Sequence, residues 1–218
     1  MKTARAFLFS TFVLLSLSLS ARAQSGAMPA APDYGSVEGS TYTNQFFGLT
    51  LTFPEGWQPH GEAAKKEIRA AGQGLIGPKD PAKVAEVERN ARRVFNLLTV
   101  TQYPLGASGP VNPTYLCFAE RLPAAAADLA DTDYVAALKK SLQATQARVT
   151  IDRDVYTESV GGKTFSVIDL TSEFRGVTMH GRYYAHVMKG YALVLAISYP
   201  TPEPLPAQAG AVKSVRFR

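Results

Sequence analysis

The stretch "YTNQFFGLTLTFPEGW", residues Tyr42–Trp57, decides the fold that this sequence predicts. Within it Leu49, Leu51 and Phe53 alternate with threonines, a period of two that indicates a half-buried β-strand. Gly48 lets the chain turn before this strand, so the aromatic segment "YTNQFF" is expected to pair with it as a hairpin. The density of aromatic side chains raises the question of a ligand-stacking platform. The alternation instead directs the strand's large side chains into a core, which the tryptophan at the end of the stretch is expected to cap.

The first 23 residues have the pattern of an export signal. Lys2 and Arg5 precede the apolar run "AFLFSTFVLLSLSLS", and "ARA" at residues 21–23 is a small-residue cleavage site. The run is short and serine-rich for a membrane span, and no cysteine follows it to carry a lipid. We therefore predict an exported protein, periplasmic or secreted, with no lipid anchor and no transmembrane segment after cleavage. An uncleaved N-terminal anchor is the alternative.

The rest of the chain is expected to hold one domain. Residues 24–40 are rich in small residues, proline and glycine, which indicates a flexible leader. Residues 41–218 suffice for one domain with its own hydrophobic core. The whole chain has a net charge of +5, but no basic run with interleaved aromatic residues follows the signal segment. Nucleic-acid binding is therefore not expected.

The expected elements fall into separate blocks of strands and helices. Helices are expected in "GEAAKKEIRAAG", with a breaker at residues 72–78, in "PKDPAKVAEVERNARRV", and from Asp131, where Asp131 or Thr132 would be the N-cap. The segment "VFNLLTVTQY" reads as a strand, and "TYLCFAERL" is ambiguous between a strand and a short helix.

The last third of the chain is expected to be a run of antiparallel hairpins. Residues 149–199 contain four strand patterns joined by glycine-containing turns at 161–162, 176 and 189–190. "LPAQAGAVKSVRF" is expected to add a helical turn and a final short strand. Because the strands cluster instead of alternating with helices, this order predicts an α+β fold with an antiparallel sheet, not a doubly wound one.

One polar strand face is the best candidate for a binding site. In "VTMHGRYYAHVM" a period of two places His180, Arg182, Tyr184 and His186 on one face. Such a face could bind a carboxylate or a phosphate, and the alternative is the solvated face of a half-exposed sheet. The two histidines are six residues apart, about 20 Å along a strand, which is too far to share one metal ion. We therefore predict no metal site and no cofactor.

No residue pattern predicts catalysis. Cys117 is the only cysteine, which excludes an internal disulfide, and it lies among apolar residues. A buried, inert thiol is therefore expected, rather than a nucleophile paired with a histidine. No serine lies in a nucleophile-elbow or S-x-x-K context. The acidic pairs Asp152/Asp154 and Asp169/Glu173 are typical of an exposed sheet surface. We predict no catalytic residue, and a cryptic hydrolase is the alternative.

The opening stretch, together with "SVRF" at residues 214–217, resembles the PsbP-like family, also called the Mog/PsbP α/β/α sandwich. The resemblance spans residues 42–217 and implies an α/β/α sandwich with a central antiparallel sheet. Its members include a photosystem II subunit, a Ran-binding protein and bacterial envelope lipoproteins, which are binding and assembly modules without a shared catalytic motif. This chain departs from the lipoproteins because it lacks a lipidated cysteine.

The resemblance implies an exported, non-enzymatic module that binds an unknown protein or complex in the cell envelope. The alternative is an accessory protein that binds a small ligand or a metal through the strand face of His180, Arg182 and His186.

Overall fold

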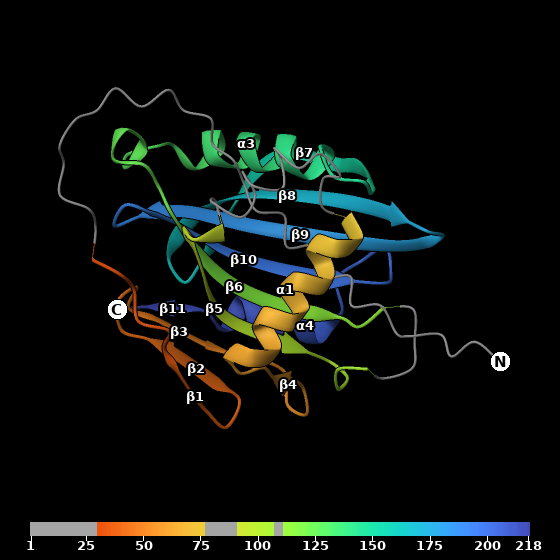
Figure 1. Cartoon of the computed structure of the whole chain (residues 1–218). Coiled ribbons are helices and arrows are strands. Elements are labelled where there is room, and N and C mark those ends of the chain that lie inside the picture. Colours follow the sequence, from red (N-terminus) through yellow and green to blue (C-terminus); the bar gives the residue numbers. More distant parts are fainter. Residues whose placement is uncertain (1–29, 77–90, 107–110) are drawn as a thin grey trace.

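Two antiparallel sheets form the fold of residues 30–76, 91–106 and 111–218, the part of the chain that the computed structural model describes (Figure 1). The larger sheet has seven strands in the order β4 (Gln58–Pro59), β5 (Val94–Thr101), β6 (Thr114–Arg121), β10 (Tyr191–Tyr199), β9 (Val177–Met188), β8 (Lys163–Phe174), β7 (Arg148–Val160). The smaller sheet has four strands in the order β1 (Ser36–Glu38), β2 (Thr41–Asn44), β3 (Leu49–Thr52), β11 (Arg216–Phe217). The helices are α1 (Glu62–Ile76), α3 (Asp131–Gln143), α4 (Pro206–Ser214) and the 3₁₀ turn η1 (Ala124–Ala126). The predicted α+β class is confirmed.

The opening stretch is a core hairpin, as predicted. Strands β2 and β3 pair antiparallel, with Tyr42 opposite Leu51. The side chains of Leu49, Leu51 and Phe53 are buried, and Trp57 is only 8% exposed in the same core. The aromatic rings of this stretch therefore mainly fill the interior of the protein.

The meander from β7 to β10 is confirmed, and its turns explain why these residues form hairpins. Each connection is a two-residue turn in which both residues have positive φ, the geometry that matches the twist of paired strands. The pairs are Gly161 (58°) and Gly162 (80°), Arg175 (50°) and Gly176 (78°), Lys189 (53°) and Gly190 (76°). Glycine adopts this conformation at no steric cost, so the turn residues fix the strand register.

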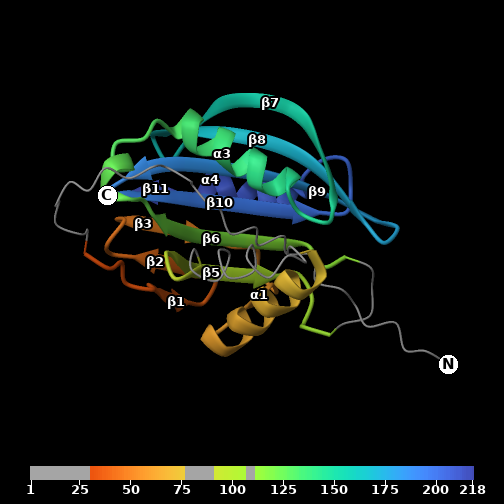
Figure 2. The same cartoon turned by 45° about the horizontal axis from the view of Figure 1, so that its top comes forward.

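The seven-stranded sheet separates two cores. Every residue of β10 is buried, and successive side chains pack into different cores. One face packs against α3, whose predicted stripe of Tyr134, Leu138 and Leu142 is buried there. The other face packs against the four-stranded sheet and Ala211 and Val212 of α4. Figure 2 shows α3 over the strands at the β7–β9 side and the four-stranded sheet at the other end of the molecule.

Helix α1 differs from the prediction, and strand β6 resolves an ambiguous one. Helix α1 continues through the predicted breaker to Ile76, although each helical glycine costs about 1 kcal/mol, and its residues Lys65 and Ile68 are buried. The ambiguous "TYLCFAERL" is strand β6, with seven buried residues in succession. The helix expected over residues 78–94 lies mostly outside the described residues, as does the signal segment, and β5 begins at Val94.

The segment predicted as a flexible leader, residues 24–40, contains β1 in its last part. The carboxylate of Asp33 accepts hydrogen bonds from the backbone N–H of Gly35 and of Phe46, and the hydroxyl of Tyr42 donates to the carbonyl of Tyr34. These bonds connect residues 33–38 to the first hairpin.

Within the described residues, no helix combines the length and the apolar character needed to cross a bilayer.

The predicted N-cap of α3 is wrong. The cap position is Ala130, and Asp131 lies in the first helical turn. Its carboxylate instead accepts from the backbone N–H of Val187 at 2.7 Å and contacts Nδ1 of His186 at 3.0 Å. The regular pairing of β8 with β9 stops at Ser166 and Ala185, so β8 offers no acceptor to the backbone N–H of Val187. The carboxylate of Asp131 supplies that acceptor.

A buried lysine supports an irregularity in β5. The register of β5 against β6 shifts between Asn96 and Leu98. The ammonium of Lys65 donates to the carbonyls of Asn96 (3.1 Å) and Leu97 (3.0 Å) and to the Glu62 carboxylate (2.8 Å). All three protons of this ammonium therefore have acceptors, which allows the cation to be buried.

We expect Tyr115→Phe to stabilise the protein by about 1 kcal/mol, because the buried hydroxyl of Tyr115 has no hydrogen-bond partner among the described residues. The matched control is Tyr134→Phe, which removes a hydroxyl that donates to Glu120 at 3.0 Å and should be neutral or destabilising. Urea unfolding of both variants measures the difference. A loss of stability in Tyr115→Phe would contradict the prediction and show that this hydroxyl has a partner.

Candidate functional site

The four residues predicted as a binding face do share one face of β9, but that face is partly covered. Tyr184 is 3% exposed, and the side chains of Arg182 and His186 retain 22% and 21% of their exposure. The face is therefore only partly solvated, with Tyr184 buried and His180, Arg182 and His186 half-buried. The alternation of side chains correctly shows which residues face the same way. It does not show that the second sheet and α4 cover that side of the seven-stranded sheet.

Arg182 is bound to an acidic partner within the protein. It lies opposite Asp169 on β8, and its Nε and Nη2 donate to the two carboxylate oxygens, the second bond at 3.1 Å. The hydroxyl of Tyr156 on β7 donates to the same carboxylate at 3.1 Å. Burial raises the pKa of Tyr156 and the pKa of Tyr184, so both hydroxyls stay protonated and can donate. An external anion at Arg182 would have to compete with Asp169.

His180 and His186 have separate partners. Nδ1 of His180 lies 2.8 Å from the hydroxyl of Thr171, which donates its single proton to Asp152 at 2.7 Å. Nδ1 of His180 must therefore be the donor in its bond to Thr171. His186 instead contacts Asp131. The described ranges contain no group of three or more histidine, cysteine or acidic side chains placed to hold a metal ion.

The remaining nucleophile and base candidates lie in the structural core or at its margin. Cys117 is fully buried, as predicted, and burial raises the pKa of its thiol far above the range of a reactive cysteine. Nε2 of His60 lies 2.8 Å from the hydroxyl of Thr101. Burial, and then the charge of Lys65, lowers the pKa of His60, so its ring is neutral at neutral pH.

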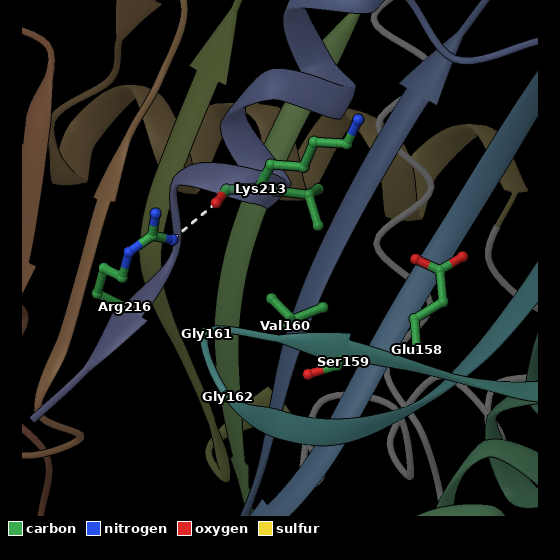
Figure 3. Close-up of a pocket in the computed structure, with 8 residues that line it drawn as sticks. Glu158, Ser159, Val160, Gly161, Gly162, Lys213 and Arg216 are labelled. Carbon is green, nitrogen blue, oxygen red and sulfur yellow. Dashed lines mark hydrogen bonds between the residues drawn. The ribbon is translucent and has the colours of Figure 1, made fainter.

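A groove opens between the β7–β8 hairpin and the segment formed by α4 and β11 (Figure 3). We call it the edge groove. Its volume is about 410 Å³, within the range of sites that bind ligands. The edge groove is lined by Glu158, Ser159, Val160, Gly161, Gly162, Val212, Lys213 and Arg216. Val160 and Val212 are buried, so its base is apolar while its rim carries charges of both signs.

The walls of the edge groove are set by close backbone approach and by a fixed arginine. A Cβ atom at Gly161 would lie 2.9 Å from the ring of Phe217 and 3.0 Å from the carbonyl oxygen of Val215, so only glycine lets the turn approach β11 this closely. Nη1 of Arg216 donates to the carbonyls of Lys213 (2.8 Å) and Val215 (2.7 Å) at the end of α4. These bonds orient the guanidinium and leave its Nε and Nη2 donors for other acceptors.

None of the residues that line the edge groove was predicted as a site residue. The segment "SVRF" was interpreted as a closing strand and as part of the family resemblance, and residues 161–162 were interpreted as a hairpin turn. The available signal was a cation directly after a helix, where it can bind the last carbonyls. That signal says nothing about Glu158, which comes to the same groove from another sheet.

Comparison with known proteins adds little to the geometry. No protein-family model matches the chain, and no curated protein matches it. A crystal structure of a Pseudomonas aeruginosa protein of unknown function, described as a putative regulator, is similar over 53% of this chain and 69% of that chain. Its sequence identity is 18% and its TM-score is 0.33, values that carry no argument about the function of this chain.

Proposed function

We propose that this chain is an exported, non-catalytic module that binds a protein or complex in the cell envelope through the edge groove. The observation that carries the proposal is the groove itself, which combines an apolar base with charged side chains of both signs. A polypeptide offers apolar, polar and charged groups to match such a lining. The histidines and Arg182, in contrast, are engaged in contacts within the fold. A binding role therefore accounts for the described side chains better than a hydrolase.

We further propose that the fold is of the PsbP-like type. In support, the two segments that carry the resemblance are neighbouring strands: β11 pairs with β3, with Phe217 opposite Leu49 and Arg216 opposite Thr50. The stacking of α3, the seven-stranded sheet and the layer that contains α4 is also the arrangement expected for an α/β/α sandwich. The alternative ligand face around His180, Arg182 and His186 has less support, because Asp169 already binds Arg182 and the two histidines do not converge.

The test is site-specific photo-crosslinking of the full chain in its native cells. A photoreactive amino acid at Lys213 should give a discrete adduct with an envelope protein. The same amino acid at Glu38 should not, because β1 lies at the edge of the small sheet opposite to β11. Equal adducts at both positions, or none at Lys213, would contradict binding through the edge groove.

Mass spectrometry of the same material should find Gln24 as the first residue, and retention of the uncleaved chain in the inner membrane would contradict export.

A further inference from the structure

Strand β7 is the end strand of the seven-stranded sheet, and its two halves differ. The register against β8 shifts between Ile151 and Arg153 and again between Arg153 and Tyr156. From Tyr156 to Val160 the pairing is regular and reaches the two-residue turn. Bulges of this kind protect a free strand edge against pairing, whereas a regular segment does not. Only the second half of β7 is therefore suited to accept another strand.

The regular half of β7 has main-chain groups that face away from β8. In an antiparallel pair, hydrogen-bonded and non-hydrogen-bonded residue pairs alternate. Val160 and Lys163 flank the two-residue turn as a bonded pair, so Ser159 and Thr157 point their N–H and C=O groups to the outer edge. Among the described residues, no strand lies on that edge. Ser159 also lines the edge groove.

The wall opposite this edge is cationic. Lys213 and Arg216 are exposed, and Figure 3 shows both side chains across the groove from the β7–β8 turn. The guanidinium of Arg216 is already oriented by two carbonyls, so a carboxylate that binds its Nε and Nη2 orders few additional degrees of freedom. Glu158 lies on the β7 side, where it disfavours a second acidic group.

We propose that the edge groove binds an extended polypeptide segment that carries one acidic side chain. The segment pairs with the main chain of Ser159 and Thr157, and its carboxylate binds Arg216, with Lys213 contributing charge. Main-chain pairing supplies affinity, and the acidic side chain supplies selectivity. The inference rests on the proposed function and names the class of ligand for the same groove.

The test is an NMR titration of the isotope-labelled mature protein with blocked heptapeptides. The probe is acetyl-Thr-Val-Thr-Glu-Thr-Val-Thr-amide, and two further peptides carry Gln or Lys in place of Glu. The Glu peptide should shift the main-chain amides of Thr157 and Ser159 and the Nε signal of Arg216, and should bind about tenfold more tightly than the Gln peptide. No shift at these amides, or equal affinity for the three peptides, would overturn the proposal.

Variants separate the two contacts. Arg216→Gln should bring the Glu peptide to the affinity of the Gln peptide. Arg148→Gln, which removes an exposed cation at the start of β7, should leave the preference unchanged. Ser159→Pro removes an outward N–H that β8 does not use, so the fold should persist while all peptides lose binding. Unchanged binding in Ser159→Pro, or loss of the preference in Arg148→Gln, would overturn the proposal.

Failure of this inference differs from failure of the proposed function. A crosslinked envelope protein at Lys213 combined with no Glu preference overturns the acidic ligand and leaves the binding module standing. A Glu preference that depends on Arg216, with no crosslinked partner in cells, overturns the envelope partner and supports the ligand class.

Discussion

Lys65→Met should destabilise the protein by about 3 kcal/mol, one of the two largest effects that the structure predicts. Methionine has nearly the volume of the lysine stem but no donors, so the carbonyls of Asn96 and Leu97 lose their shared ammonium. The lysine side chain is only 9% exposed, and water cannot readily replace it at these carbonyls. Chemical unfolding measures the loss, and hydrogen exchange at Leu97 and Leu98 should accelerate where the strand is irregular.

Lys66→Met is the matched control for this experiment. Lys66 is the next residue of α1 and is exposed, with no hydrogen bond or ion pair to another described residue. Its substitution should change the free energy of unfolding by less than about 0.5 kcal/mol. Similar losses in both variants would show that helix α1 needs positive charge in general, and would contradict the specific role of Lys65 at the irregularity.

Glu120→Gln should remove most of the loss of stability that the wild type shows as pH rises from about 4.5 to 7. Glu120 is 2% exposed under α3, and burial raises the pKa of its carboxyl to about 7, partly opposed by the hydrogen bond from Tyr134. The folded state therefore holds a proton that the unfolded state has released, and raising the pH costs stability until the folded carboxyl ionises. The cost is then about 3 kcal/mol.

The measurement is the free energy of unfolding of wild type and variant from acidic pH to about pH 8. The amide stays neutral, so the variant should be the more stable protein at the alkaline end and should show a flatter profile. Glu38→Gln, at an exposed position of β1, should keep the profile of the wild type. A profile of Glu120→Gln parallel to that of the wild type would show that the carboxylate is already ionised at low pH, contrary to the prediction.

Local residue chemistry explains why much of the fold could be predicted. Turn residues determined the meander, because Gly162, Gly176 and Gly190 sit where the chain needs positive φ. The alternation of Leu49, Leu51 and Phe53 identified a strand with one buried face. Strand β6 stayed ambiguous for the opposite reason: both of its faces are buried, so its side chains show no alternation that distinguishes a strand from a buried helix.

The candidate site depended on contacts between distant residues, which local patterns do not contain. Asp131 has the sequence context of a helix cap, but its acceptor role at Val187 joins residues 56 positions apart. The alternation placed Arg182 correctly on a strand face and could not show that Asp169 lies opposite on the next strand. The edge groove has Glu158 of β7 on one wall and Arg216 of β11 on the other, and these two strands belong to different sheets.

The two register shifts in the first half of β7 also limit how many chains can assemble on this protein. Only Tyr156–Val160 remains straight enough to template a neighbour, and a fibril needs a longer, flat edge that repeats from chain to chain. A bound segment that pairs with Tyr156–Val160 would reach the irregular half of β7 within a few residues, and its pairing with β7 would end there. The complex should therefore contain one bound segment per protein, and it should not aggregate even at high protein concentration.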